Sequence, residues 1–190
     1  VLYKAGRAEE SIPASIEALA IHERTPFLTV RERSRFLYNL AVQAEDLGRW
    51  DTAIDAYREA VALFDADSSV TENQRLGTRE RLAYCLHEAG RYGEAMEENR
   101  AVLAGGERLF GAGSDKLLVV VTNLAQNAHA LGDPAEARAF LDRRLDIAAR
   151  HGVEDHVDGS LFQLGVLAFE TGNAGEAEAF MQRRLELAEK

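Results

Sequence analysis

The densest group of side chains that could do chemistry is the segment HGVEDHVD, residues 151–158, where two histidines and three carboxylates fall within eight residues. Imidazole and carboxylate groups are common ligands of transition metals, so this composition is compatible with a metal site. The alternative is a polar linker between two helices, and an acidic linker without supporting hydrogen bonds holds a metal only weakly. We therefore expect a structural linker here, and no metal site.

Motifs of common enzymes are missing from the chain. The 190 residues contain no phosphate-cradling glycine loop, no nucleophile elbow and no His-Glu-x-x-His pair. The single cysteine, Cys85, lies in the apolar run LAYCL, which favours a position in the core. We expect a non-enzymatic protein without catalytic residues or cofactors.

Composition narrows the classes of partner. The formal net charge is −10 and no block of Lys and Arg occurs, which disfavours nucleic acid and anionic membrane surfaces. No apolar stretch approaches the roughly 18 residues of a membrane span, and nothing resembles a signal peptide, so a cytoplasmic location is expected. Abundant Ala, Leu, Glu and Arg with only three prolines predict a chain that is nearly all helix.

One glycine-centred frame recurs along the whole chain. Its glycines are Gly6, Gly48, Gly90, Gly132 and Gly172, spaced by 42, 42, 42 and 40 residues. Mostly apolar residues eleven, eight, seven and four positions before the last four glycines lie on one face of a helix, and the glycine suits the left-handed end of that helix. A second helix follows, with a small residue five positions after the glycine and a larger one nine positions after it. A period of this length predicts stacked helical hairpins.

The frame Gly48-x-Trp50-x-x-Ala53-x-x-x-Tyr57-x-x-Ala60, preceded by Leu40-Ala41, resembles the tetratricopeptide repeat. The unit of about 42 residues is similar to the kinesin-light-chain type, which is also common in bacterial proteins. The resemblance implies an all-α, right-handed α-solenoid of about nine helices in one array. We expect a partial repeat at 1–33 and repeats at 34–75, 76–117, 118–157 and 158–190. The chain ends within a predicted helix, so we also expect it to be part of a longer protein.

Two departures from the family pattern carry structural expectations. Arg144 and Arg184 stand where the family has alanine, so we expect their helices to turn a more polar side outward or to shift in register. Pro13 falls inside a predicted helix, where it removes a backbone donor. We expect Ser11 to cap a shortened helix that has Pro13 in its first turn.

The resemblance implies that the first helix of each hairpin lines a concave groove that contacts partners. In the family an asparagine matching Asn39 and Asn123 holds bound peptide, and an amide can both donate to and accept from a peptide backbone. The alternative is that these positions are ordinary surface. His87 and His129 are equivalent positions that either make the groove pH-sensitive or are surface histidines. The candidate contacts are Arg35, Tyr38, Asn39, Arg81, Tyr84, His87, Asn123 and Gln126.

Tyr38, Val42 and Val119 replace the basic and amide residues of the chaperone-tail clamp found in some tetratricopeptide proteins, so that function is not expected. The leading interpretation is an interaction scaffold that binds a peptide segment or partner protein, neutral or basic, in the groove. The alternative is a sensing module of a larger bacterial regulator, linked to an NTPase or DNA-binding domain. Uncapped ends would also permit self-association.

Overall fold

The structure is a computed structural model that describes residues 8–189. These residues form two compact units. The first unit ends at Arg91 and holds α1 (Ala8–Arg24), α2 (Val30–Asp46), α3 (Trp50–Ala66) and α4 (Glu72–Glu88). The second begins at Tyr92. Its elements are α5 (Tyr92–Phe110), the short 3-10 helix η2 (Asp115–Leu117), α6 (Leu118–Ala130), α7 (Pro134–His151), α8 (Glu154–Glu170) and α9 (Ala174–Ala188).

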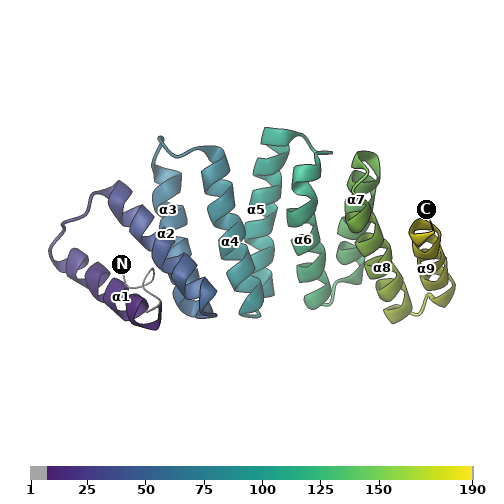
Figure 1. Cartoon of the computed structure of the whole chain (residues 1–190), viewed down its shortest axis with the longest axis horizontal. Coiled ribbons are helices and arrows are strands. Elements are labelled where there is room, and N and C mark those ends of the chain that lie inside the picture. The colour runs from purple at the N-terminus through teal and green to yellow at the C-terminus, as the bar shows by residue number, and fades with distance from the viewer. Residues whose placement is uncertain (1–7, 190) are drawn as a thin grey trace. The chain divides into compact units, whose positions relative to one another are not determined.

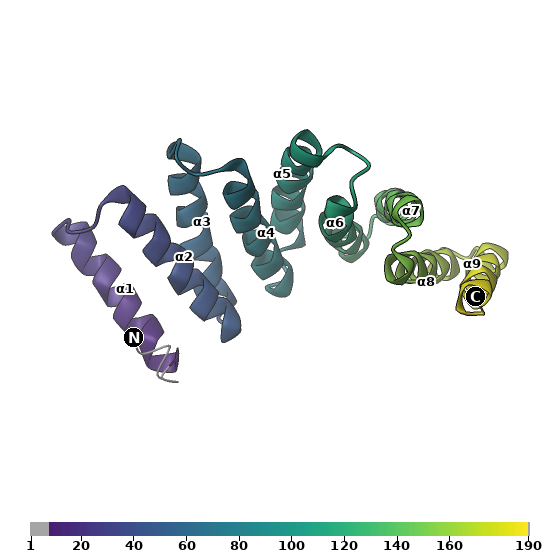
Figure 2. The ribbon, with the colours of Figure 1, turned by 45° about the horizontal axis from the view of Figure 1, so that its top comes forward.

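Consecutive helices pack against one another in each unit. In the first unit α2 contacts α3 and α3 contacts α4, and in the second unit the chain of contacts runs from α5 through to α9 (Figures 1 and 2). Each hairpin reverses direction over a short turn, so neighbouring helices run antiparallel. The predicted all-α fold of helix hairpins is confirmed.

Glycine ends the first helix of each complete hairpin, as the repeat predicts. Gly48, Gly90, Gly132 and Gly172 have φ angles of 65°, 74°, 75° and 82°, a left-handed conformation that side chains with a Cβ rarely adopt. At the first of these turns Gly48 N–H donates to Glu45 O at 2.9 Å and Arg49 N–H donates to Ala44 O at 2.8 Å. This pair of bonds satisfies carbonyls that the helix end leaves open. The first glycine of the frame, Gly6, lies outside the described residues.

Small buried residues let the paired helices approach closely. Ala53 in the first unit, and Ala137 and Ala177 in the second, each stand five residues after a stop glycine and are at most 9% exposed. Larger apolar side chains fill the space around them, and in the first unit Tyr57 is fully buried among these. Cys85 is buried as predicted, and burial raises the pKa of its thiol to about 12, so the thiol stays protonated.

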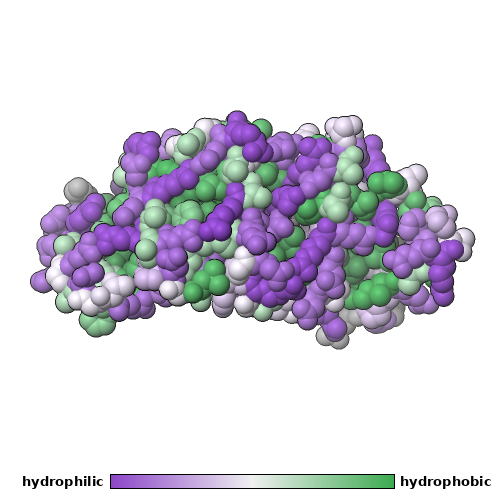
Figure 3. Space-filling model, turned by 180° about the vertical axis from the view of Figure 1, so that it is seen from behind, coloured by the Kyte–Doolittle hydropathy of each residue, from purple (hydrophilic) through white to green (hydrophobic). Residues whose placement is uncertain are grey.

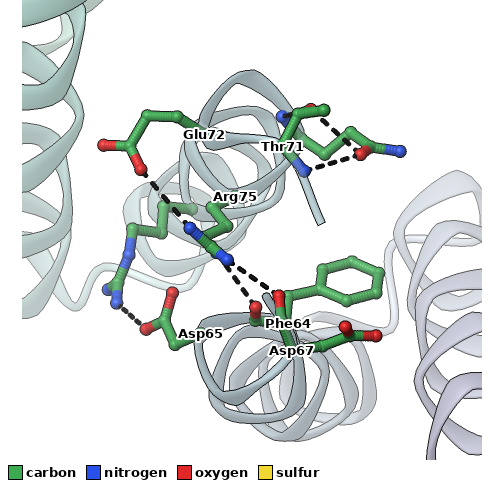
Figure 4. Close-up of polar contacts among 8 residues, drawn as sticks. Phe64, Asp65, Asp67, Thr71, Glu72 and Arg75 are labelled. Carbon is green, nitrogen blue, oxygen red and sulfur yellow. Dashed lines mark hydrogen bonds and ion pairs between the residues drawn. The ribbon is translucent and has the colours of Figure 1, made fainter. Parts of the chain in front are cut away.

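Arg75 fastens the connection between α3 and α4 (Figure 4). Its Nε donates to Phe64 O at 3.0 Å and its Nη2 donates to Asp67 O at 2.8 Å, so it satisfies carbonyls at the C-terminal end of α3. Thr71 begins α4 with a capping box, in which its backbone N–H and hydroxyl both donate to Gln74 Oε1. The two helices are therefore held at a defined distance at this end.

The expectation of a shortened first helix is wrong. Pro13 lies inside α1, which runs for 17 residues from Ala8 to Arg24. Ser11 is within the helix instead of capping it, and its Oγ donates to Gln43 Oε1 of α2 at 2.8 Å. The helix therefore begins before the residue that was expected to cap it.

The expected linker at 151–158 is also shorter than the sequence indicates. Of this segment, His151 ends α7 and residues 154–158 already belong to α8, which leaves only Gly152 and Val153 between the helices. Gly152 ends α7 in the left-handed conformation, with φ 66°.

Two further properties hold for the described residues. Among residues 8–189 no group of three or more His, Cys, Asp or Glu side chains is placed to hold a metal ion. None of the helices in this part of the chain has the length and apolar character needed to cross a bilayer.

Candidate partner-binding site

Four of the predicted contact residues line one open pocket in the first unit. Arg35, Tyr38 and Asn39 project from α2, and Arg81 projects from α4. The pocket has a volume of about 540 Å³ and is also lined by Phe64, Gln74, Gly77, Thr78 and Glu80. The Arg75 contacts at the α3–α4 connection hold the end of α3 that carries Phe64 and the start of α4 that carries Gln74 (Figure 4).

The pocket offers several polar groups to a ligand. Asn39 and Arg35 are exposed, and Asn39 supplies an amide that both donates and accepts. Glu80 is half-buried, and burial raises the pKa of its carboxyl above the ordinary value. Tyr38 packs edge-on against Tyr57, with ring centroids 5.8 Å apart, which fixes the tyrosine ring at the pocket wall.

Arg81 is held by an ion pair that sequence reasoning missed. Its Nη1 donates to both carboxylate oxygens of Glu45 at 2.8 Å, and the hydroxyl of Tyr57 donates to the same carboxylate at 2.7 Å. The Glu45 side chain is only 14% exposed, whereas Arg81 is 43% exposed, and the cluster links α2, α3 and α4. Partial burial lowers the pKa of Arg81, but the hydrogen bonds and charge of Glu45 outweigh it, and the pKa of the guanidinium is raised.

The other predicted contacts lie outside this pocket. Tyr84 of α4 is 44% exposed and packs edge-on against Trp50, with centroids 6.1 Å apart. His87 is half-buried near the end of the same helix. Asn123 and Gln126 belong to α6 of the second unit, where Gln126 lines a smaller pocket. The structure thus groups four of the eight candidates and distributes the rest over two units.

His129 is less available than an ordinary surface histidine. Its Nε2 lies 2.7 Å from Glu170 Oε2, so the side chain bridges α6 and α8. The surface drawn in Figure 3 is mostly hydrophilic, with apolar side chains exposed in scattered places. Exposed apolar residues of the second unit include Phe162 and Phe169 of α8, which are 47% and 72% exposed.

The expectation that Arg144 turns outward is wrong. The Arg144 side chain of α7 is 8% exposed, and its Nη1 donates to Gln163 Oε1 of α8 at 2.8 Å. Arg184 of α9 also faces a neighbouring helix, since its Nε donates to Asp158 Oδ1 at 2.7 Å and its guanidinium covers the ring of Phe162. Both helices keep their register, because Ala137 and Ala177 remain buried against their partner helices.

The sequence carried a weak signal for these inward-facing arginines. An arginine at a buried repeat position needs polar partners, and Gln163 and Asp158 stand on the helix between α7 and α9. Sequence periodicity identifies the buried face of each helix, but it does not identify which polar side chains form hydrogen bonds with a neighbouring helix.

Comparison with protein families identifies the repeat. Residues 74–150 and residues 34–67 each match a model of the tetratricopeptide repeat, and the two matches together cover more than half of the chain. The chain belongs to the tetratricopeptide-repeat family. Neither match is to a catalytic family.

Solved structures with a similar fold include kinesin-light-chain-like tetratricopeptide proteins. BtubC (BKLC) from P. vanneervenii is 21% identical, with a TM-score of 0.69 over 95% of this chain and 73% of that chain. A Podosopora anserina protein, assigned as a kinesin light chain with nearly identical TPR-like repeats, is 20% identical. Its TM-score is 0.75 over 98% of this chain and 90% of that chain. The α-solenoid class predicted from the sequence is therefore confirmed.

A more distant structural neighbour is a Rap protein solved in complex with Competence and Sporulation Factor. It is 15% identical, with a TM-score of 0.63 over 98% of this chain and 51% of that chain. A search of curated proteins by sequence gives no match. The fold is one that serves protein–protein interaction, and the comparisons do not support the alternative of a sensing module within a larger regulator.

Proposed function

We propose that the chain is a protein–protein interaction scaffold that holds an extended peptide segment of a partner against α2 and α4. The observation that carries this proposal is the convergence of Arg35, Tyr38, Asn39 and Arg81 on one pocket of about 540 Å³. These residues come from two helices, and all four stand at repeat positions that the sequence assigns to the groove.

The chemistry of the pocket suits a peptide backbone. The Asn39 amide pairs with a backbone N–H and C=O at once, whereas the ring of Tyr38 supplies an apolar surface for a side chain. Glu45 fixes the Arg81 guanidinium in place before a ligand arrives, so less rotamer entropy is lost on binding. A neutral or basic segment fits the net charge of −10. The neighbouring fold of the Rap protein, solved with a bound factor, supports a binding role.

The proposal is tested with peptides selected on the protein itself. A phage-displayed library of random peptides is panned on the wild-type chain, and the Kd of each selected peptide is measured by fluorescence anisotropy. Loss of two hydrogen bonds at about 1 kcal/mol each predicts that Asn39→Ala weakens binding by a factor of about 30. We expect the melting temperature of Asn39→Ala to stay nearly unchanged, because the Asn39 side chain is exposed.

The matched control is Asn73→Ala, which removes another exposed asparagine, on α4, that is not among the residues lining the pocket. This variant is expected to bind like the wild type. Undiminished binding by Asn39→Ala would show that this amide does not hold the peptide, and the proposed site would be abandoned.

A further inference from the structure

A second pocket, of about 200 Å³, opens between α6, α7 and α8 of the second unit. Its floor is made by side chains that are nearly fully buried, and one wall is the exposed ring of Phe162. The pocket is therefore an apolar hollow that reaches the surface. Its apolar lining residues are Ala125, Ala137, Leu141, Phe162, Val166 and Leu167.

The repeat allows this hollow to be compared with the same place in the first unit. Leu141 and Tyr57 each stand nine residues after a stop glycine, and His129 and Glu45 each stand three before that glycine. Gln163 corresponds in the same way to Arg81, each nine residues before the next stop glycine. In the first unit these three positions form the closed Tyr57–Glu45–Arg81 cluster, with bonds of 2.7 and 2.8 Å.

In the second unit the same three positions do not bond to one another. Leu141 has no hydroxyl group and is shorter than tyrosine, His129 turns to Glu170 at 2.7 Å, and Gln163 accepts from Arg144 at 2.8 Å. The space that the buried Tyr57 ring fills in one repeat is left open in the other. Sequence divergence at one set of repeat positions thus accounts for the hollow.

Arg144 fixes the orientation of the Gln163 amide. A guanidinium has donors only, so the amide atom that faces it must be the oxygen, and the NH₂ group of Gln163 is left as a donor. Arg144 cannot readily move, because its Nε and Nη2 lie 3.3 and 3.2 Å from His156 Nδ1 and it packs beneath Gly159. A Cβ at residue 159 would lie 3.1 Å from the Arg144 Nη2.

The lining determines what fits. An apolar cavity of about 150 Å³ accepts a benzene-sized molecule, so a hollow of about 200 Å³ has room for one phenyl or branched aliphatic side chain. The residues that line it carry no carboxylate and no permanent cation, and the one titratable group, His129, is engaged with Glu170. A charged ligand side chain would therefore lose its hydration without gaining a partner.

We propose that this pocket binds one large uncharged side chain, phenyl or branched aliphatic, of an extended peptide whose backbone carbonyl accepts a hydrogen bond from Gln163. A peptide presents this combination of an apolar side chain beside a polar carbonyl at every residue. Arg144 acts as a positioning residue, since it works through the Gln163 amide. The inference rests on the proposed peptide-binding function and states which kind of peptide side chain the second unit binds.

The test uses the whole chain with ¹³C-labelled methyl groups and blocked pentapeptides in which glycines flank one central residue. We expect central Leu and Phe peptides to shift the methyl signals of Leu141, Val166 and Leu167 in a saturable way, and central Ala, Glu and Lys peptides to shift them little. Leu141→Tyr, which installs the residue found at the equivalent position of the first unit, should remove the response. Val166→Tyr repeats the test at a half-buried position, where folding is less at risk, and Tyr84 is its counterpart in α4.

The positioning role has its own readout. Loss of one neutral hydrogen bond predicts that Gln163→Ala weakens the Leu pentapeptide about fivefold. Arg144→Met should weaken it by a similar factor alone and by nothing further in the Gln163→Ala background, because Arg144 acts only through Gln163. Equal, additive losses would indicate a general structural role and overturn the assignment of Arg144.

Other outcomes distinguish the two proposals. Asn39→Ala should leave pentapeptide binding in the second unit unchanged. If the pentapeptides fail to bind while the selected library peptides still depend on Asn39, the pocket inference falls and the proposed function stands. If the methyl signals shift with protein concentration alone and Leu141→Tyr removes that shift, a second copy occupies the pocket and the peptide proposal is wrong.

Discussion

At the scale of single residues, the Glu45 carboxylate makes contacts between helices that its position on a polar helix face does not indicate. It accepts hydrogen bonds from both Tyr57 and Arg81, which stand on two other helices. Burial, followed by the hydrogen bond to Glu45, raises the pKa of the Tyr57 hydroxyl, so this group stays protonated and remains a donor. One side chain thereby joins α2, α3 and α4.

Removing the Tyr57 hydroxyl isolates one of these bonds. Tyr57→Phe keeps the ring and deletes a hydrogen bond to a charged acceptor, so the free energy of unfolding should fall by about 1.5–3 kcal/mol. Tyr38→Phe is the matched control, because Tyr38 is half-buried beside Tyr57 and contacts it through the ring. Urea unfolding of both variants measures the difference, and equal effects would contradict the assigned role of the hydroxyl.

At the scale of helices and turns, the stop glycines adopt a left-handed backbone conformation that residues with a Cβ rarely adopt, whereas Gly93 does not. Gly90 adopts φ 74°, and Gly93, three residues later at the start of α5, has an ordinary φ with open space where a Cβ would lie. The repeated glycine is therefore required by the turn, and the one beside it is not.

This contrast predicts opposite signs for one substitution. Gly90→Ala forces alanine into the left-handed region and should lower the free energy of unfolding by about 1–2 kcal/mol. Gly93→Ala should raise it by about 0.5–1 kcal/mol, because alanine loses less backbone entropy in a helix. Thermal and urea unfolding of the two single variants gives the comparison. A stabilising Gly90→Ala would refute the turn assignment.

The contact between α8 and α9 has a pH dependence whose sign follows from Asp158. Hydrogen bonds from Arg184 hold the pKa of the Asp158 carboxyl below its ordinary value of 3.8. Since the folded-state pKa is lowered, the stabilisation is fully present above pH 3.8 and is lost as the pH falls through the folded-state value. Replacing this carboxylate should therefore matter at neutral pH and cease to matter in acid.

The measurement compares melting temperatures of the wild type and Asp158→Asn between pH 2 and pH 7. The wild type should melt higher above pH 3.8, and the gap should shrink below it. Glu178→Gln, at an exposed position on α9, serves as the control and should follow the wild type at all pH values. A gap that persists unchanged in acid would mean that the Arg184 ion pair is not its source.

At the scale of the whole molecule, periodicity carries most of the information about the fold and little about the site. The glycine spacing and the small residue five positions later predict which helices pair. Gly48 adopts the expected left-handed conformation, and Ala53 and Tyr57 are buried as expected. These features are predictable because each depends on backbone geometry or volume within one hairpin. Whether the whole chain is one array with the expected repeat boundaries stays a prediction, as do self-association through its ends and its place in a longer protein.

The candidate site is less predictable because its chemistry depends on contacts between hairpins. Asn39 and Arg35, predicted as groove contacts, line a pocket together with Arg81, and their role in binding stays a prediction. The burial of Arg144 was not expected, since its partners Gln163 and His156 lie 19 and 12 residues away along the chain. Interactions of that kind follow from how helices lie against one another, which a single sequence specifies only indirectly.

Tyr57, Glu45 and Arg81 correspond by repeat position to Leu141, His129 and Gln163, so the repeat keeps its turns while the side chains between its helices differ. All six residues lie inside helices, and Gly48 and Gly132 end the preceding helices in the same left-handed conformation. We therefore expect an exchange of these three residues to change one pocket without changing the glycine turns on either side of it.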